Sequence, residues 1–221
     1  MTKKSFTNQS LIFIFCLLSA CASTSPTLPI DEHSSSSEQS IISSQSSLSI
    51  ETNSSISAST SFPYPISDAK SRITKKQFGT YVTPTSSPIQ PEKFTGFHTG
   101  IDFETFADEQ DTDVSITAIC EGKVIFAGHV NGYGGVLIQS CLYKGEVVTV
   151  LYGHLKQSSI SFKKNDVVAS GDRIGILGKG FSNEIDFERK HLHLGIHTGN
   201  SIEYRGYVKS DNELSGWIDP Y

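Results

Sequence analysis

Residues 120–152, CEGKVIFAGHVNGYGGVLIQSCLYKGEVVTVLY, carry the pattern that decides the fold class. Three short runs rich in β-branched and aromatic residues, KVIFAG, GVLIQS and EVVTVLY, are separated by turns that contain Asn131-Gly132 and Lys144-Gly145. Dipeptides such as Asn-Gly between apolar runs are typical of β-hairpins. This stretch therefore predicts consecutive strands that pair antiparallel.

The same alternation of short strands and turns continues on both sides of this stretch. Further runs of β-forming residues are SITAIC (115–120), DVVAS (166–170), RIGILG (173–178) and HLHLGIH (191–197). No segment shows a long 3.6-residue period, so the sequence does not predict the crossover helices that parallel sheets need. We expect an all-β fold over residues 68–221, built as a small antiparallel β-sandwich or partly open barrel.

Two cysteines flank the first predicted hairpin. The midpoint between Cys120 and Cys141 falls between residues 130 and 131, within the turn segment HVNGYGG (129–135), so the two cysteines are expected nearly opposite each other on paired strands. In an exported protein such a pair can form a disulfide, which for a loop of this length adds about 3 kcal/mol. Two free core thiols, or two metal ligands, are the alternatives.

The N-terminus has the features of an export signal. Lys3 and Lys4 precede the apolar run LIFIFCLLSA (11–20). As a helix this run rises about 15 Å, which is about half the thickness of a bilayer's hydrocarbon core. A basic start, a short apolar run and small residues predict a signal peptide over residues 1–20, with a buried core helix as the alternative.

The sequence LSAC (18–21) resembles the lipobox of bacterial lipoproteins, in which the cysteine is acylated and becomes the mature N-terminus. This resemblance implies lipidation of Cys21, and acyl chains anchor a protein by burying methylene groups in a bilayer. We therefore expect an exported protein of the cell envelope that is lipid-anchored to a bacterial membrane.

A serine-rich segment follows this cysteine. Serine makes up 15 of the 28 residues from Ser34 to Ser61, a composition that cannot bury enough apolar surface to fold. We expect residues 21–67 to form a disordered tether, which also accounts for the low hydrophobic content of 37%. The formal net charge of −5 argues against nucleic acid as a partner.

Histidine and aspartate residues fall in three motifs. FHTGID places His98 and Asp102 four residues apart around a glycine, and LYGHL places His154 at the end of a predicted strand. HLHLGIH places His191 and His193 on one face of a strand, because alternate residues of a strand project to the same side. The leucines that follow these two histidines then face the core.

These five side chains are more than one metal ion needs. A catalytic zinc ion takes three protein ligands and keeps an open position for water. The two remaining groups suit the two other tasks of such a site, accepting a proton and stabilising the oxyanion. The spacing alone does not say whether His191 or His193 is the ligand. No HExxH motif is present, so the glutamate-based scheme of many zinc proteases is not available.

Taken in order, the three motifs resemble those of the lysostaphin- and LytM-type zinc endopeptidases, which cut peptidoglycan peptides. That family carries an HxxxD motif, a later histidine at a strand end and a final HxH. The pieces QFGTY, CEGKVIFAG, GYGG and SGDRIGILGKG are also similar to the family, so the resemblance covers residues 72–200.

The resemblance implies a site in an open groove on a small antiparallel β domain. One zinc ion would be bound by His98, Asp102 and His193. His154 and His191 would remain unligated, to activate water and to stabilise the intermediate.

The chain departs from the family at three places near the last motif. Leu194 replaces the usual aromatic residue after HLH, and Gly195 replaces the acidic residue that follows. The segment FSNEIDFERK (181–190) is longer than the family's short turn. These changes alter the expected shape of the groove but delete none of the implied ligands.

Two further residues receive an expectation from strand periodicity. Tyr152 would share the face of His154, and would either position the substrate or pack in the core. His197 would be a solvated strand end, with a role in lining or supporting the groove as the alternative.

We therefore expect a membrane-tethered, monomeric zinc endopeptidase that hydrolyses stem peptides or cross-bridges of peptidoglycan. One alternative is a catalytically inactive module of the same family that binds and activates another wall hydrolase. Such relatives typically lose zinc ligands, and this chain keeps all three. The other alternative is an adhesin or wall-binding module whose metal is structural.

Overall fold

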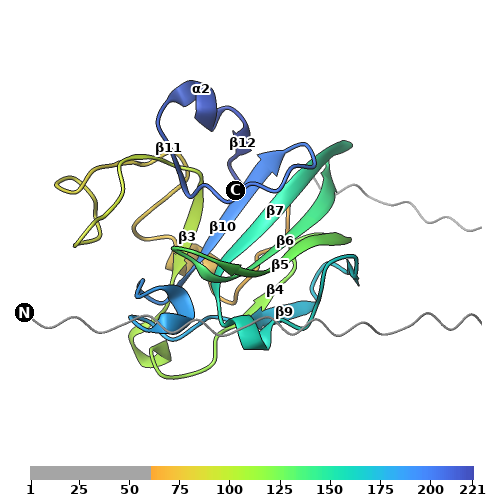
Figure 1. The fold of residues 1–221 in the computed structure, drawn as a ribbon, viewed down its shortest axis with the longest axis horizontal. Coiled ribbons are helices and arrows are strands. Elements are labelled where there is room, and N and C mark those ends of the chain that lie inside the picture. Colours follow the sequence, from red (N-terminus) through yellow and green to blue (C-terminus); the bar gives the residue numbers. More distant parts are fainter. Residues whose placement is uncertain (1–60) are drawn as a thin grey trace, which may run out of the picture. The chain divides into compact units, whose positions relative to one another are not determined.

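Strands and tight turns make up most of the chain that the structure describes (Figure 1). The computed structural model describes residues 61–221. In chain order the helices and strands are α1 (Ala69–Arg72), β1 (Tyr81–Val82), β2 (Gly96–His98), β3 (Gly100–Glu104), β4 (Ser115–Thr117), β5 (Gly122–Val130), β6 (Gly134–Tyr143), β7 (Glu146–Leu155), β8 (Val167–Val168), β9 (Arg173–Ile176), β10 (His191–Thr198), β11 (Tyr207–Val208), α2 (Asp211–Leu214) and β12 (Trp217–Ile218).

The largest sheet has seven strands in the order β12-β10-β7-β6-β5-β8, with β3 also paired to β10. Figure 1 shows β10, β7, β6 and β5 running side by side. A three-stranded sheet, β1-β2-β11, and the pair β4-β9 complete the strands of residues 61–221. Every strand pair is antiparallel, and the described strands form no closed barrel.

The fold is therefore all-β and antiparallel, as the sequence predicted. Each of the predicted runs contains a strand, from β4 to β10. The sequence did not predict that the first histidine motif also lies on strands, β2 and β3. These strands are short and the motif contains two polar ligand-type residues, so the apolar pattern that marks a strand is weak there.

The hydrophobic core lies on one face of β10. Leu192, Leu194 and Ile196 are fully buried and pack with Phe103 of β3 and Val150 of β7. Because side chains alternate along a strand, this face leaves the histidines of HLH on the opposite side. Burial of the leucines thus fixes the direction in which both histidines point.

A disulfide joins Cys120 to Cys141 in the structure, with their Cα atoms 6.2 Å apart. It lies at the open end of the β5–β6 hairpin, where Cys141 pairs with Gly122. The turn at Asn131-Gly132 sets the pairing as far as Phe126, and a one-residue shift between Val124 and Phe126 sets the register beside the disulfide.

Packing begins before residue 68, the expected start of the domain. The ring of Phe62 stacks on that of Tyr143 with centroids 4.7 Å apart, and Ile66 belongs to the core. The predicted signal peptide (1–20), the lipidation site Cys21 and the tether as far as residue 60 lie outside the described residues. Within residues 61–221, no helix has the length and apolar character to cross a bilayer.

Candidate metal centre and groove

Strand β10 brings the three motifs together because it lies between β3 and β7. His193 of β10 pairs with Asp102 of β3 on one side and with Gly153 of β7 on the other. Directly paired residues project to the same face of a sheet. Asp102 and Gly153, which are about 90 and 40 residues from His193 in the chain, therefore lie on either side of it.

A β-bulge turns His154 onto this face. One residue of β6, Val136, lies opposite both Gly153 and His154, and His154 has a left-handed backbone with φ of 60°. A bulge shifts the alternation of side chains by one residue. The prediction that Tyr152 shares the face of His154 is therefore wrong: Tyr152 is fully buried in the core, and its hydroxyl accepts a hydrogen bond from the Ile119 N–H at 2.8 Å.

Gly153 makes room for an aromatic ring in the site. A Cβ atom at this position would lie 2.5 Å from Cδ1 of Tyr133, so only glycine fits. The Tyr133 ring lies over His154 and His193, with centroid distances of 5.0 and 5.4 Å. Burial raises the pKa of the Tyr133 phenol, and its hydroxyl has no hydrogen-bond partner among the described residues.

Three buried atoms form a nearly equilateral triangle. Nε2 of His98 lies 3.0 Å from Nδ1 of His193, and each of these nitrogens lies 3.1 Å from Oδ1 of Asp102. All three side chains are less than 5% exposed. Ligands in a tetrahedral zinc site with bonds of 2.0–2.1 Å lie about 3.3 Å apart, so the triangle is close to that size.

The protonation of the ring nitrogens also suits a cation. Nδ1 of His98 lies 3.2 Å from the carbonyl oxygen of Gln77, so this nitrogen carries the proton and Nε2 presents a lone pair. That lone pair faces the Asp102 carboxylate, and two acceptors this close repel each other unless a cation lies between them. Two imidazoles and one carboxylate are a ligand set that zinc prefers. The residues present therefore fit a zinc ion.

Arg189 holds the other oxygen of the aspartate. Its Nη2 donates to Oδ2 of Asp102 at 2.6 Å and to Oε1 of Glu104 at 2.8 Å. Burial alone would raise the pKa of Asp102, but its electrostatic interactions with the imidazoles of His98 and His191 and with the Arg189 guanidinium hold it well below its usual value. The carboxylate thus stays ionised, with Oδ1 turned toward the histidines.

His191 and His154 lie beside the triangle without completing it. Nδ1 of His191 donates to the carbonyl oxygen of Arg189 at 2.8 Å, so the lone pair is on Nε2, which lies 3.5 Å from Oδ2 of Asp102. The rings of His154 and His191 are 4.2 Å apart. Burial lowers the pKa of His154 to about 3 and lowers that of His191 well below its usual value. Both rings are therefore neutral near pH 7.

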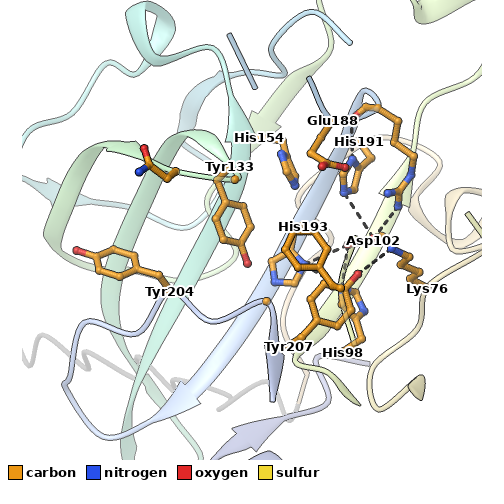
Figure 2. Close-up of a pocket in the computed structure, with 15 residues that line it drawn as sticks. Lys76, His98, Asp102, Tyr133, His154, Glu188, His191, His193, Tyr204 and Tyr207 are labelled. Carbon is orange, nitrogen blue, oxygen red and sulfur yellow. Dashed lines mark hydrogen bonds and ion pairs between the residues drawn. The ribbon is translucent and has the colours of Figure 1, made fainter. Parts of the chain in front are cut away.

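A groove of about 260 Å³ opens over these side chains (Figure 2). Figure 2 shows Tyr133 and Tyr204 on one side of the histidines and Tyr207 and Lys76 on the other. The residues that line the groove are Lys76, Phe94, His98, Asp102, Asn131, Gly132, Tyr133, His154, Glu188, Arg189, His191, His193, Tyr204, Gly206 and Tyr207.

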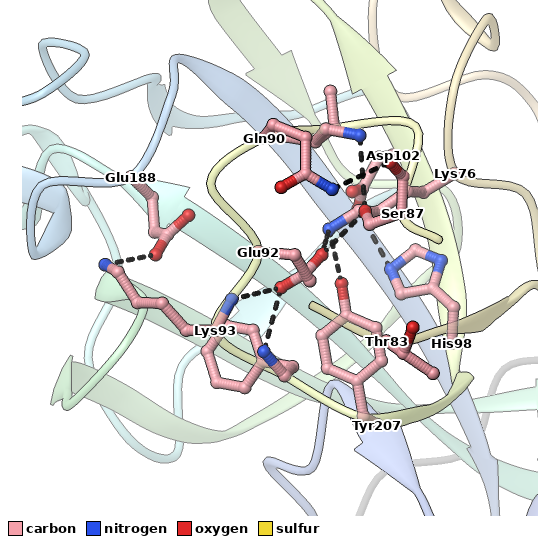
Figure 3. A network of polar contacts seen from close by, with 12 residues as sticks. Lys76, Thr83, Ser87, Gln90, Glu92, Lys93, His98, Asp102, Glu188 and Tyr207 are labelled. Atoms are coloured by element: carbon pink, nitrogen blue, oxygen red, sulfur yellow. Dashed lines mark hydrogen bonds and ion pairs between the residues drawn. The ribbon is translucent and has the colours of Figure 1, made fainter. Parts of the chain in front are cut away.

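A buried ion pair fixes one wall of the groove (Figure 3). Nζ of Lys76 donates to Oε2 of Glu92 at 2.6 Å and to the Tyr207 hydroxyl at 2.7 Å. Oε1 of Glu92 accepts hydrogen bonds from the backbone N–H groups of Lys93 and Phe94. Burial tends to raise the pKa of Glu92, but these bonds, led by the one from Lys76, lower it overall. The backbone of residues 92–94 is therefore held against this wall of the groove through the Glu92 carboxylate.

The structure brings all five candidate residues of the sequence analysis into one groove, at His98, Asp102, His154, His191 and His193. His197 does not belong to it and is not a solvated strand end, since its half-buried ring packs against Trp217 at 4.9 Å.

Sequence reasoning missed Arg189, Tyr133, Lys76 and Tyr207. A signal existed for Arg189, which continues the alternation of His193 and His191 by two residues. Tyr133 stood inside the GYGG turn, where a tyrosine is also an ordinary hairpin residue. Lys76 and Tyr207 are 131 positions apart, and nothing in the sequence pairs them.

Comparison with known proteins agrees with this geometry. Residues 96–204 match the family model described as Peptidase family M23. An uncharacterized protein of Haemophilus influenzae is 33% identical over 95 residues, which are 42% of this chain and 21% of that protein. The chain thus covers about a fifth of the length of this curated relative.

Solved structures that resemble this chain include a catalytic domain of lysostaphin and the protein Csd3. The catalytic domain of the antimicrobial peptidase lysostaphin from Staphylococcus simulans is 25% identical, with a TM-score of 0.43 over 69% of this chain and 93% of that one. Csd3 of Helicobacter pylori is 21% identical, with a TM-score of 0.42 over 68% of this chain and 35% of that one.

Proposed function

Because residues 96–204 form a domain of peptidase family M23, of the lysostaphin and LytM type, we propose that this protein is a zinc-dependent endopeptidase of peptidoglycan. Its substrates are peptide bonds in stem peptides or cross-bridges. The observation that carries the proposal is the triangle of His98, Asp102 and His193 atoms, with sides of 3.0–3.1 Å, next to two unligated histidines. When bound there, zinc polarises the scissile carbonyl and lowers the pKa of a water molecule.

His191 is the proton carrier in this scheme. Its Nδ1–H bond to the Arg189 carbonyl holds the ring so that the Nε2 lone pair faces the site. Nε2 accepts a proton from water as the water oxygen bonds to the carbonyl carbon. The same proton then passes to the amide nitrogen as the carbon–nitrogen bond breaks. This releases an amine and a carboxylic acid, and the acid gives up the second water proton to solvent to become a carboxylate.

His154 is the hydrogen-bond donor to the carbonyl oxygen as that oxygen gains negative charge. A neutral imidazole carries one N–H group, and burial keeps His154 neutral by lowering its pKa to about 3. A donor that is already fixed in a water-poor site stabilises an oxyanion without reorganisation. The left-handed backbone of the bulge is what fixes it there.

We also propose that the protein is exported and anchored in the cell envelope by a lipid on Cys21. The sequence that supports this is the short apolar run at residues 11–20 followed by LSAC. A domain on a long serine-rich tether then acts on the wall from the membrane. We propose that it acts as a monomer.

Hydrolysis of purified peptidoglycan by the purified protein, with and without a chelator, tests the activity. His193→Ala should lose zinc and activity together, because it removes a ligand. His191→Ala and His154→Ala should keep about one zinc per chain and lose roughly 10²–10⁴-fold in rate, the range of a general acid or base. His197→Ala is the matched control, since its imidazole lies on the same strand but packs against Trp217. It should keep both zinc and activity.

A fully zinc-loaded wild-type protein that cuts no wall substrate would favour the module that binds and activates another hydrolase. A site emptied by His191→Ala but not by His193→Ala would reverse the ligand assignment.

A further inference from the structure

Two exposed phenylalanines lie on the loop of residues 181–190 in a backbone conformation that phenylalanine rarely adopts. Phe181 is 72% exposed with φ of 54°, and Phe187 is 61% exposed with φ of 63°. A left-handed backbone is unfavourable for a residue with a bulky side chain. Such strain persists only where the surroundings impose it, and it often marks a functional segment.

The loop is anchored from within, so its shape does not depend on the two phenyl rings. Ile185, between them in sequence, is fully buried. Oδ2 of Asp186 accepts a hydrogen bond from the Gly132 N–H at 2.6 Å, and the Phe187 N–H donates to the Ser182 carbonyl at 2.9 Å. The fold therefore holds the loop rigidly and leaves both rings outside.

This loop is continuous with the wall of the groove. Glu188 lines the groove and directly follows Phe187. The backbone of Phe181 also reaches it, since the Phe181 N–H donates to the Glu188 carbonyl at 2.7 Å. Gly132, which Asp186 holds, lines the groove as well. Both exposed rings thus belong to residues that touch or adjoin the substrate wall.

We propose that this loop docks the glycan strands of the wall polymer, with Phe181 and Phe187 as the residues in contact. The inference rests on the proposed function and names a part of the substrate that the peptide groove does not hold. Pyranose rings present apolar C–H faces that pack flat on aromatic rings, and exposed aromatic side chains next to a binding groove mark such surfaces.

The charge of the loop favours a glycan over a membrane surface. Glu184 and Asp186 lie between the two phenylalanines and Glu188 follows Phe187, with Glu184 paired to Lys156 and Glu188 to Lys93. Three carboxylates thus outnumber the two basic residues of the loop, Arg189 and Lys190, whereas attraction to an anionic bilayer needs an excess of basic residues. Sugar hydroxyls can instead donate hydrogen bonds to carboxylates.

Replacing both phenylalanines by asparagine tests the proposal. Asparagine adopts a left-handed backbone readily, so the double variant Phe181→Asn/Phe187→Asn should melt no lower than wild type. Binding to purified sacculi is measured by co-sedimentation in a chelator, which prevents hydrolysis. We expect the double variant to bind at least 10-fold more weakly. Hydrolysis of a soluble, sugar-free stem-peptide dimer by the zinc-loaded enzyme should stay within about 2-fold of wild type.

Leu142→Thr is the control, because Leu142 is 67% exposed but lies near the opposite end of β6 from Gly134. It should bind sacculi like wild type. Unchanged sacculus binding by the double variant would overturn the proposal. An equally large loss in the rate of hydrolysis of the sugar-free peptide would also overturn it. So would a double variant that keeps its binding to sacculi but loses binding to anionic vesicles. A wild-type protein that cuts neither substrate would refute the proposed function, while the difference in sacculus binding would still support docking.

Discussion

Arg189→Met removes the cation that two carboxylates share at the base of the groove. Arg189 donates from Nη2 to Asp102 at 2.6 Å and to Glu104 at 2.8 Å, and from Nε to both Glu104 oxygens at 3.1 Å. The Arg189 and Glu104 side chains are each 12% exposed and that of Asp102 is 2% exposed. Methionine keeps the apolar stem and much of the volume, so the change acts mainly on charge.

The magnitude follows from this burial. Removing one partner of a buried ion pair costs about 3–5 kcal/mol, because the other charge is left uncompensated. For a domain of this size, each kcal/mol lowers Tm by about 2–4 °C. We therefore expect the metal-free variant to melt roughly 10 °C below the metal-free wild type.

Added zinc should reverse part of this loss, because a divalent cation at the triangle compensates the same charge on Asp102. Zinc should thus raise the Tm of Arg189→Met by more than it raises the Tm of wild type. Thermal melts in chelator and in excess zinc measure both increments. The control is Arg205→Met, whose half-exposed side chain pairs with Glu203 and Glu213 at the surface and should change Tm by less than about 4 °C.

Two results would refute this reasoning. One is a metal-free Arg189→Met protein that melts within 2 °C of wild type. The other is an equal zinc-induced rise in Tm for both proteins, since Arg189 would then not balance the charge of Asp102.

The remaining predictions concern pH and anchoring. Burial lowers the pKa of His154 to about 3 in the folded protein. Below pH ~6.5 the unfolded chain therefore takes up a proton at this residue that the folded chain does not. As the pH falls, the metal-free protein should lose about 1.4 kcal/mol of folding stability per pH unit through this group. Denaturant melts at several pH values between 6 and 4 should show a shallower decline for His154→Gln, and equal slopes would contradict the assignment. Cys21→Ser should release the protein from membranes without changing the activity of its domain; fractionation that finds the variant still bound would exclude a lipid on Cys21.

The sequence alone was sufficient for the class of fold and for the set of candidate residues. Short β-forming runs, the Asn131-Gly132 turn and the absence of a helical period indicated antiparallel strands. These signals are local, because a strand's alternation and a turn's dihedral preferences depend on neighbours in the chain. The order of the motifs led to the five groove residues for the same reason, since each motif is complete within a few positions.

Tertiary structure decided how those residues meet. Only the pairing of β10 with β3 and β7 places His193 opposite both Asp102 and Gly153. Only the bulge puts His154 in the groove and leaves Tyr152 in the core, because an extra residue in one strand is invisible until the partner strand is known.

The ion pairs of Arg189 were likewise decided by the tertiary structure. Its alternation with the HLH histidines is readable in the sequence, but its partners Asp102 and Glu104 are more than 80 residues away. Whether an arginine is solvated or balances a buried carboxylate depends on which distant groups the fold removes from water with it, and only the packed structure determines that.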